Sequence, residues 1–275
     1  MIAPKPIVTV TSSEASAHTA IRAVVHAPPD RSKTFSSLTL SEKCPVNLTH
    51  LRPKVLTRRT PMVTLDDLLW VCFDRGATAG FLEQGLTVPQ IDLSDVDMTR
   101  WDEVVPQVHS LIKEHVSRGV QGIVIDTASS LDRFLSYRAN IIKGLRKFDL
   151  YDDVRNSHSR FATPIMALPC HVLFLCHSRA LLDMDGTSEA VQNQQRARRA
   201  AGLGGIVPAI TGQSLTYYTA NSSLVMPIIA RKKPEGIEYF FAPGHPEFDA
   251  KRRFYLPDEM PADWRLVKRA LGMKE

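Results

Sequence analysis

The chain alternates short runs of apolar residues with longer amphipathic segments through its first two thirds. Uninterrupted apolar runs predict strands that are buried on both faces, and the amphipathic segments between them indicate crossover helices. The predicted strands are Ile21–His26, Leu68–Asp74, Pro89–Leu93, Gly122–Asp126 and Val172–His177. The pattern therefore predicts an α/β fold with a mostly parallel sheet flanked by helices.

Two of the crossover segments carry apolar residues at helical spacing. They are Trp101–Arg118 and Leu131–Phe148, and both are expected to be helices. After a long polar stretch, Asp183–Gly205, the chain becomes rich in strand-forming residues. Ser223–Ala230 and Ile237–Ala242 are separated by a Pro-Glu-Gly turn, which predicts a C-terminal antiparallel extension of the sheet.

The organisation expected from these elements is one core with irregular ends. Residues 1–20 are expected to form an N-terminal arm, residues 21–260 the core and residues 261–275 a C-terminal helix. The last segment, Pro261–Leu271, opens with Pro and Asp and is followed by Gly, which are the signals of a capped helix.

Composition narrows the class of protein. The chain has 275 residues, of which 44% are hydrophobic, which is enough for a substantial core. The net charge of +5 permits nucleic-acid binding without requiring it. Four cysteines are too few for a secreted disulfide framework, and no apolar run approaches the ~20 residues that span a bilayer. We therefore expect a soluble, cytoplasmic protein without a membrane segment.

The candidate chemistry begins after the first predicted strand. The loop Ala27–Thr34 connects that strand to the helical segment Phe35–Leu40. A P-loop needs this order because backbone N–H groups and a helix N-terminus surround the phosphates, a Lys reaches the β and γ oxygens, and a hydroxyl holds Mg²⁺. Lys33 and Thr34 stand at the positions of these last two groups.

The loop has lost the glycines that a P-loop normally carries. Ala27 and Ser32 stand at the two glycine positions. Glycine reaches backbone conformations that cost other residues on the order of 1–3 kcal/mol. An ordinary proline-bearing connection before a helix is therefore an alternative interpretation of this octapeptide taken alone.

The segment Ala27-Pro28-Pro29-Asp30-Arg31-Ser32-Lys33-Thr34-Phe35 resembles the G-P-P-x-x-G-K-T-T loop of phage-encoded RecA-like ATPases, a group that includes single-strand annealing recombination proteins. Later segments resemble further motifs of this group in the same order. They are a Walker B strand in Gly122–Thr127, a strand ending in a sensor His in Leu168–His177, a P-x-x-x-G element in Pro208–Gly212 and an A-K-x-R element in Ala250–Arg253. The likeness spans residues 21–260 and rests on the order of the motifs.

The resemblance implies ATP and Mg²⁺ as cofactors of a RecA-like P-loop NTPase core. The phosphates would be surrounded by Pro29, Asp30, Arg31, Ser32, Lys33 and Thr34. Thr34 would hold Mg²⁺, and Asp126 would accept from a metal-bound water. His177 would sense the γ-phosphate. An Asp at a strand end is also a common helix cap, and a His there is also commonly a half-buried structural residue; these alternatives stay open.

The carboxylate that would orient the attacking water is not evident. In the RecA group a Glu follows the second core strand, but Gly76 stands at that position here. Asp74, two residues earlier, and Glu83, in the following segment, are the candidate replacements, and neither reproduces the family spacing. Hydrolysis is therefore expected to be impaired or absent.

A zinc site made of Cys170-His171 and Cys176-His177 is excluded by geometry. Six strand residues at ~3.3 Å each separate the two pairs by about 20 Å. Because side chains alternate along a strand, Cys170 and Cys176 are expected to face one side together with Val172 and Phe174, and to belong to the core.

The best candidates for DNA contact are Arg196, Arg198 and Arg199, which lie in the polar stretch after the sensor strand. RecA-like proteins place a DNA-contacting loop at this point, whereas a solvated basic helix face is the simpler alternative. Arginine and glutamine without aromatics favour backbone contacts, which are sequence-tolerant and salt-sensitive. A second basic cluster, from Arg52 to Arg59, is a weaker candidate.

The function expected from the sequence is that of a phage RecA-like, ATP-binding protein that assembles with itself on single-stranded DNA in recombination, replication or repair. Arg253 would reach the γ-phosphate of a neighbouring subunit, unless it only decorates a turn. The alternative is a catalytically inactive, P-loop-derived structural or interaction protein, which the residues Ala27, Ser32 and Gly76 together favour.

Overall fold

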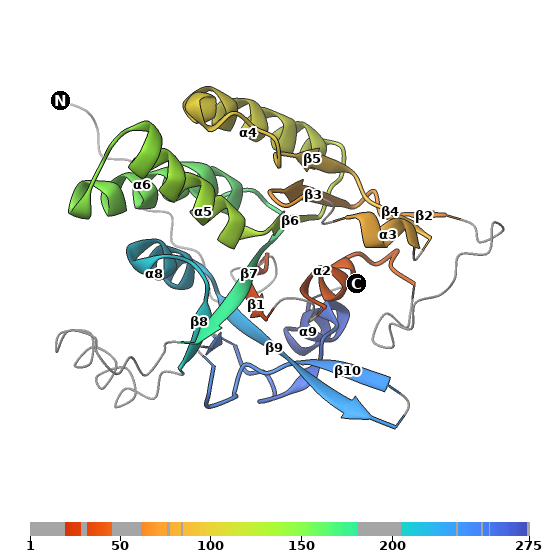
Figure 1. Cartoon of the computed structure of the whole chain (residues 1–275). Coiled ribbons are helices and arrows are strands. Elements are labelled where there is room, and N and C mark those ends of the chain that lie inside the picture. The colour runs from red at the N-terminus through yellow and green to blue at the C-terminus, as the bar shows by residue number, and fades with distance from the viewer. Residues whose placement is uncertain are drawn as a thin grey trace, which may run out of the picture.

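A computed structural model describes most of the chain. The described residues are 20–28, 32–45, 62–75, 78–83, 85–180, 205–234, 236–248, 250–252 and 254–273. They form an α/β fold in which helices cover both faces of a central twisted sheet (Figure 1). In the described part of the chain, no helix combines the length and the apolar character needed to cross a membrane.

The strands of the structure are short, apart from the long β7 and β9. They are β1 (Arg22–Ala27), β2 (Val63–Thr64), β3 (Leu68–Cys72), β4 (Leu86–Thr87), β5 (Gln90–Asp92), β6 (Gly122–Asp126), β7 (His171–Ala180), β8 (Ile206–Pro208), β9 (Leu224–Lys233), β10 (Gly236–Phe241), β11 (Lys251–Arg252) and β12 (Met260–Pro261). The main sheet has the order β12-β10-β9-β1-β7-β6-β3-β5, and β2 and β4 form a separate pair.

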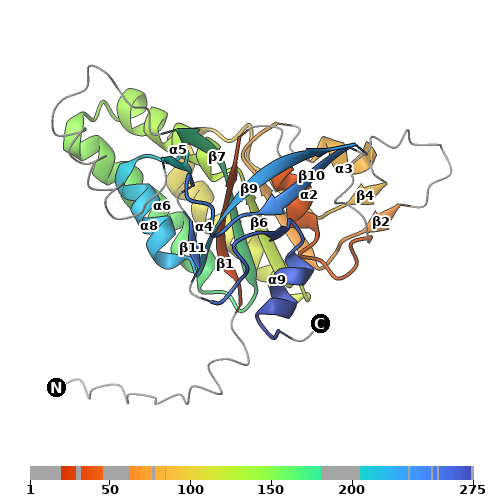
Figure 2. The ribbon, with the colours of Figure 1, turned by 90° about the horizontal axis from the view of Figure 1, so that it is seen from below.

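The six strands from β9 to β5 pair in parallel throughout. Strands β10, β11 and β12 join them in antiparallel pairings at the C-terminal side of the sheet, and β8 pairs antiparallel with β7. The predicted fold class is therefore confirmed: the sheet is mostly parallel, it is flanked by helices, and it carries a C-terminal antiparallel extension (Figure 2).

The helices divide into two layers. They are α2 (Lys33–Leu38), α3 (Ala79–Glu83), the 3-10 turn η1 (Met98–Arg100), α4 (Trp101–Ser117), α5 (Ala128–Tyr137), the π-helical turn η2 (Arg138–Ile142), α6 (Lys147–Met166), α8 (Gly212–Asn221) and α9 (Trp264–Ala270). One face of the sheet packs against α4, α5, α6 and α8 and the other against α2, α3 and α9, so each face has its own buried core.

The alternation of side chains along β7 follows the prediction. Cys170, Val172, Phe174 and Cys176 belong to the core under α4, α5, α6 and α8, whereas Leu173 and Leu175 belong to the core on the opposite face. Burial raises the pKa of the Cys176 thiol above its ordinary range. The cysteines of this strand are thus packing residues, as β-strand geometry requires.

The single helix predicted over Leu131–Phe148 is wrong. Helix α5 ends at Tyr137, continues as the π-helical turn η2 and stops before Gly144, whose φ of +68° is readily adopted only by glycine. A second helix, α6, follows from Lys147 to Met166. Its buried face includes Ser157, His158 and Ala162 beside only a few large apolar residues, which explains why its apolar periodicity is weak.

Helix α9 packs on the short helix α2. The backbone N–H of Trp264 donates to Thr39 Oγ1 at 2.8 Å, and Lys268 Nζ donates to the carbonyl of Leu40 at 2.8 Å. The indole of Trp264 lies against Phe241, with ring centroids 4.8 Å apart. The C-terminal helix therefore fixes α2 in place on the sheet.

Candidate functional site

The candidate site lies at the carboxyl edge of the parallel strands, where ligands of open α/β sheets commonly bind. Strand β1 ends at Ala27, which pairs with His177 of β7. Strand β6 ends at Asp126, which pairs with Cys72 of β3 and Leu175 of β7. The fold therefore brings the loop after β1, the end of β6 and His177 to neighbouring positions on one edge.

Lys33 is the first residue of α2, and its side chain is buried under the preceding loop. Its Nζ donates to the carbonyl oxygens of Ala27 at 3.2 Å and of Pro28 at 3.1 Å. The ammonium group thus points back into the loop between β1 and α2, as a phosphate-binding Lys must. The tip of that loop, Pro29, Asp30 and Arg31, lies outside the described residues.

The two missing glycines have different consequences. Ser32, at the N-terminus of α2, has φ 56° and ψ 21°, which is the left-handed conformation that glycine normally supplies. This geometry costs a non-glycine residue roughly 1–2 kcal/mol. Ala27 is the last residue of β1 and has extended backbone, so a side chain at this position costs no strain. Only one of the two substitutions therefore strains the loop.

Thr34 and Asp126 meet beside the N-terminus of α2. Thr34 Oγ1 donates to Asp126 Oδ2 at 3.2 Å, and Trp70 Nε1 donates to the same oxygen at 3.2 Å. The Asp126 side chain is buried. A hydroxyl and a carboxylate in contact at a helix N-terminus form a pair of oxygen groups suited to Mg²⁺ and its bound waters.

The carboxyl of Asp126 has an unusual acidity. Burial raises its pKa to about 6, and the charge of Asp74 contributes to the rise. Hydrogen bonds from Trp70 and Thr34, and the charge of Lys33, oppose it. A positive ion at this point would favour the ionised form and lower the pKa.

The alternative role of Asp126, as the cap of the following helix, is taken by its neighbour. Thr127 is the N-cap of α5, and its Oγ1 accepts from the backbone N–H of Ser130 at 3.1 Å. The peptide bond between Asp126 and Thr127 is cis. The carboxylate of Asp126 accepts from Thr34 and Trp70, and the cap of the following helix is supplied by Thr127.

Asp74 lies at the same edge, two residues beyond β3. Its carboxylate accepts from Thr127 Oγ1 at 3.2 Å and from Ser130 Oγ, and it lies 3.7 Å from the guanidinium of Arg133. Asp74 is thus held by α5, next to Asp126. Gly76 and the side chain of Glu83 lie outside the described residues.

His177 lies in the part of β7 that continues past the end of the neighbouring strand β6. Its backbone N–H donates to Ser129 Oγ at 3.0 Å, which ties β7 to the first turn of α5. The side chain is half-buried. Its place opposite Ala27 puts it at the start of the loop that contains Lys33.

The predicted DNA-contacting residues Arg196, Arg198 and Arg199, and the predicted trans-acting Arg253, lie outside the described residues. The strands on either side of residues 181–204 are described. Ser178 of β7 pairs with Pro208 of β8, beyond the end of β6. Segment 181–204 is therefore connected to the sheet at the same edge as the candidate site.

The sequence did not reveal a buried polar network behind this site. His158 Nε2 lies 2.9 Å from Asp132 Oδ1, and His158 Nδ1 lies 3.0 Å from the hydroxyl of Tyr218. The backbone N–H and the hydroxyl of Thr211 donate to Asp132 at 3.1 and 2.9 Å. The network joins α5, α6 and α8, and no motif marks its members because they come from three separate segments.

Trp70 was also missed. It lies in an apolar strand, where an indole is simply expected to be core, and only the pairing of β3 with β6 places its N–H beside Asp126.

Among the described residues, no group of three His, Cys, Asp or Glu side chains is arranged to hold a metal ion alone. A metal ion at Asp126 would thus need Thr34, water and a phosphate ligand as further partners.

Comparison with known proteins finds similarity to solved structures only. No protein-family model and no curated protein matches the sequence. Among solved structures, the KaiC-like protein PH0186 from Pyrococcus horikoshii is similar with a TM-score of 0.38 at 9% identity, over 80% of this chain and 76% of that one. The RadB recombinase is similar with a TM-score of 0.40 at 12% identity, over 84% of this chain and 89% of that one. These values are too low to transfer any function.

Proposed function

We propose that the chain binds Mg²⁺-ATP at the carboxyl edge of its sheet and acts on single-stranded DNA in recombination, replication or repair. The observation that supports the nucleotide part is the arrangement of Lys33, Thr34 and Asp126. Segments separated by about ninety residues place an ammonium, a hydroxyl and a carboxylate around one helix N-terminus. A structural connection between a strand and a helix has no need of this set.

The residues present fit the proposed cofactors. Two of the acceptors of the Lys33 ammonium are the carbonyls of Ala27 and Pro28, and phosphate oxygens would be charge-assisted acceptors for the same group. Thr34 Oγ1 and Asp126 would hold the Mg²⁺ with its waters, which would neutralise the phosphate charge. Ser32 already adopts the left-handed conformation that a glycine supplies at this position of a P-loop.

Hydrolysis is proposed to use Asp74 as the group that orients water. Its carboxylate lies at the correct edge and is ordered by Thr127 and Ser130. The same contacts favour the second candidate function, a nucleotide-binding module that does not hydrolyse, because the oxygens of Asp74 already accept hydrogen bonds from two hydroxyls and would have to release them to orient a water.

Phosphate release decides between these two functions. We expect the wild-type chain to release phosphate from Mg²⁺-ATP slowly, and faster when single-stranded DNA is present. The rate of release by Asp74→Asn is expected to be lower than that of the wild type by at least about tenfold. The variant is expected to bind a fluorescent ATP analogue as the wild type does. Binding without release, with and without DNA, would instead identify the chain as a non-hydrolysing module. Release that is unchanged in Asp74→Asn would assign the role to another acid.

A surface that supports DNA binding lies at the tip of the hairpin formed by α5 and α6. Arg22, at the start of β1, donates to the carbonyl of Met166, so α6 ends at the amino edge of the sheet. His158 of the same helix contacts Asp132 near the carboxyl edge. The eleven residues before His158 therefore extend about 16 Å beyond that edge.

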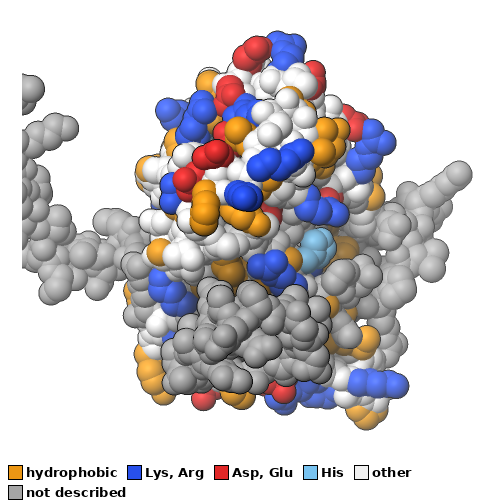
Figure 3. All heavy atoms as spheres, turned by 60° about the vertical axis from the view of Figure 1, so that its left-hand side comes forward, with side chains coloured by type: hydrophobic (Ala, Val, Ile, Leu, Met, Phe, Trp, Pro, Cys, Tyr) orange, Lys and Arg blue, Asp and Glu red, His pale blue; other side chains and the backbone are white. Residues whose placement is uncertain are grey.

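The hairpin tip, defined as residues 137–151, combines exposed rings with positive charge. Of its four basic residues, Arg146 and Lys147 are exposed, whereas Arg138 is buried against Asp102 and Asp153 and Lys143 pairs with Asp153. The exposed large apolar side chains on it are Tyr137, Ile141, Ile142, Phe148 and Tyr151. Figure 3 shows this side of the molecule, with Lys, Arg, Asp and Glu side chains set among apolar ones in its upper half. Exposed aromatic rings beside the exposed Arg146 and Lys147 offer stacking surfaces for bases and cations for phosphates, which is what a single strand needs.

The DNA part of the proposal predicts a separate loss at the tip. Phe148→Ala combined with Tyr151→Ala is expected to lower the affinity for single-stranded DNA by at least about tenfold, because each stacked base contributes about 1–3 kcal/mol. The matched control is Tyr255→Ala, since Tyr255 is 95% exposed on another part of the molecule. Fluorescence anisotropy over a salt series measures both affinity and the number of phosphate contacts.

Two other results of this DNA titration would exclude a candidate DNA surface. If the double variant binds as the wild type does, the tip is not the DNA surface. If Arg196, Arg198 and Arg199 changed together to Ala leave affinity and its salt slope unaltered, segment 181–204 is not the DNA surface either. Self-assembly on DNA, with Arg253 reaching a neighbouring nucleotide, is part of the proposal and is measured by sedimentation with and without DNA.

A further inference from the structure

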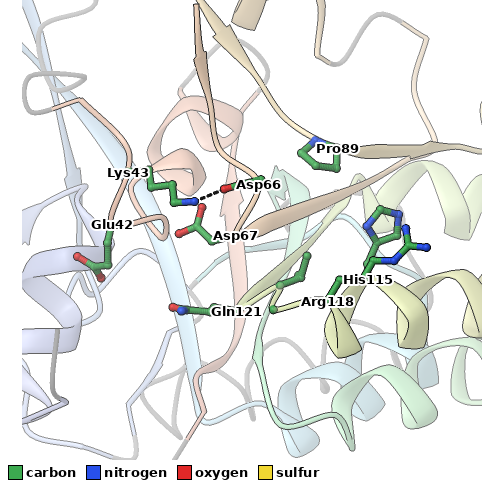
Figure 4. Close-up of a pocket in the computed structure, with 10 residues that line it drawn as sticks. Glu42, Lys43, Asp66, Asp67, Pro89, His115, Arg118 and Gln121 are labelled. Carbon is green, nitrogen blue, oxygen red and sulfur yellow. Dashed lines mark hydrogen bonds and ion pairs between the residues drawn. The ribbon is translucent and has the colours of Figure 1, made fainter.

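A second hollow lies at the opposite, amino edge of the sheet. It is a pocket of about 420 Å³, formed where the segments before β3, β5 and β6 meet the segment after α2 and the last turn of α4 (Figure 4). This volume lies within the range of small-molecule sites. The candidate nucleotide site is at the other end of the same strands, so this pocket is a separate feature.

Asp67 is the buried polar group of this pocket. Asp67 is 9% exposed, and one of its carboxylate oxygens accepts a hydrogen bond from Ser41 Oγ at 2.6 Å. Its carbonyl accepts from the backbone N–H groups of Gln121 and Gly122 at 2.8 and 3.1 Å, which fixes its backbone between β3 and β6. Within the described residues, the second carboxylate oxygen has no hydrogen bond or ion pair. This oxygen is not among the fully enclosed unpaired atoms of the described residues, so it is accessible from the pocket that Asp67 lines and can accept from a ligand there.

The cations around the pocket are engaged with other acids. Lys43 forms its ion pair with Asp66, although its charge also acts on Asp67. Lys268 pairs with Glu42. Figure 4 shows Asp66 and Asp67 on one side and His115 and Arg118 on the other.

The last turn of α4 adds to the negative character of the pocket. Arg118 pairs with Glu114 within the same helix, which partly offsets its charge. The pocket lies against the C-terminal end of α4, and a helix C-terminus carries a partial negative charge. The uncompensated charge at the Asp67 wall is therefore negative.

We propose that this pocket binds a primary alkylammonium group, which donates to the second oxygen of Asp67. A divalent metal ion is the poorer occupant, because no group of three ligating side chains is found in the described residues. Pro89 and Val120 also line the pocket and offer apolar surface to the alkyl stem. The same chemistry is carried by a free alkylamine and by the lysine side chain of a peptide, and the experiment below separates the two.

The first test uses the unmodified protein. n-Butylamine and Nα-acetyl-lysine methylamide are titrated into ¹⁵N-labelled chain, and backbone amide shifts are followed. We expect saturable shifts at Asp67 and at residues 119–122, with dissociation constants on the order of millimolar for so few atoms. 1-Butanol, which has the same shape and no charge, is expected to give no saturable shift there. The absence of saturation with both amines overturns the proposal.

The second test uses Asp67→Asn, which keeps an oxygen for the bond from Ser41. It is expected to weaken amine binding at least tenfold. Asp95→Asn is the matched control, because Asp95 is exposed and pairs with Arg75 outside the pocket. Equal binding by Asp67→Asn and the wild type would overturn the proposal. Binding of both amines supports a site for the ammonium alone, and much tighter binding of the lysine derivative supports a peptide ligand. If Asp67→Asn does not fold, the shift map of the wild type decides.

Discussion

Lys33→Met is expected to lower the affinity for Mg²⁺-ATP by roughly 10- to 100-fold, the range that follows from losing hydrogen bonds to a charged group. Methionine keeps the apolar stem of the buried lysine and removes only the ammonium that donates to Ala27 and Pro28. The fold should therefore persist. Titration of a fluorescent ATP analogue in the presence of Mg²⁺ measures the effect, and the melting temperature confirms that the variant is folded.

The control for this experiment is Lys43→Met. Lys43 is largely exposed and pairs with Asp66 at the amino edge of the sheet, far from the loop after β1. The same chemical change there should leave nucleotide affinity within about twofold, as expected for exposed ion pairs that contribute little. Equal affinities of Lys33→Met and the wild type would mean that the loop is an ordinary connection and that nucleotide, if bound, binds elsewhere.

Asp126→Asn is expected to stabilise the free protein at neutral pH while removing the dependence of nucleotide binding on Mg²⁺. The pKa of Asp126 is raised from 3.8 to about 6 in the folded state. Between these values the folded chain keeps a proton that the unfolded chain has released, so wild-type stability falls as pH rises from about 4 to 6. Above pH 6 the full cost is present, and it is at most about 3 kcal/mol for a shift of about two units.

Urea unfolding at pH 4 and pH 7.5 measures this difference. The advantage of Asp126→Asn should be small at pH 4 and close to its maximum at pH 7.5. Asp66→Asn is the opposite case, because the ion pair with Lys43 lowers the pKa of Asp66 and its carboxylate favours the folded state at high pH. If Asp126→Asn lost stability at pH 7.5, the raised pKa of Asp126 would be wrong. If Mg²⁺ still strengthened nucleotide binding to this variant, the proposed metal role of Asp126 would be wrong.

The parallel strands were predictable because a strand buried on both faces must be apolar along its whole length. Strand β6, Gly122–Asp126, has the predicted bounds, and β1 differs from the prediction by one residue at each end. Helix α6 was not predicted, since its inner face carries Ser157 and His158 where apolar residues are expected. The polarity of that face is explained by Asp132 and Tyr218, which come from other segments.

The sequence was enough to predict which residues belong to the candidate site, but not how their backbones and side chains are arranged. Lys33, Thr34 and Asp126 are marked by motif order, and the structure brings them together. The left-handed backbone of Ser32 was not predictable, because a serine gives no local signal for positive φ. The bond from Trp70 to Asp126 depends on the register of β3 against β6, which only the folded sheet fixes.

The docking of α9 on α2 has a consequence for the order in which the protein is made. Strand β1 leaves the ribosome first, yet its neighbours in the sheet are β7 and β9, and α2 is held by residues near position 264. Contacts of such long sequence separation form late and slowly. During synthesis the helix after the loop with Lys33 therefore lacks these contacts until α9 has emerged. If the proposed nucleotide site is correct, a chain truncated before α9 would therefore be expected to bind ATP poorly.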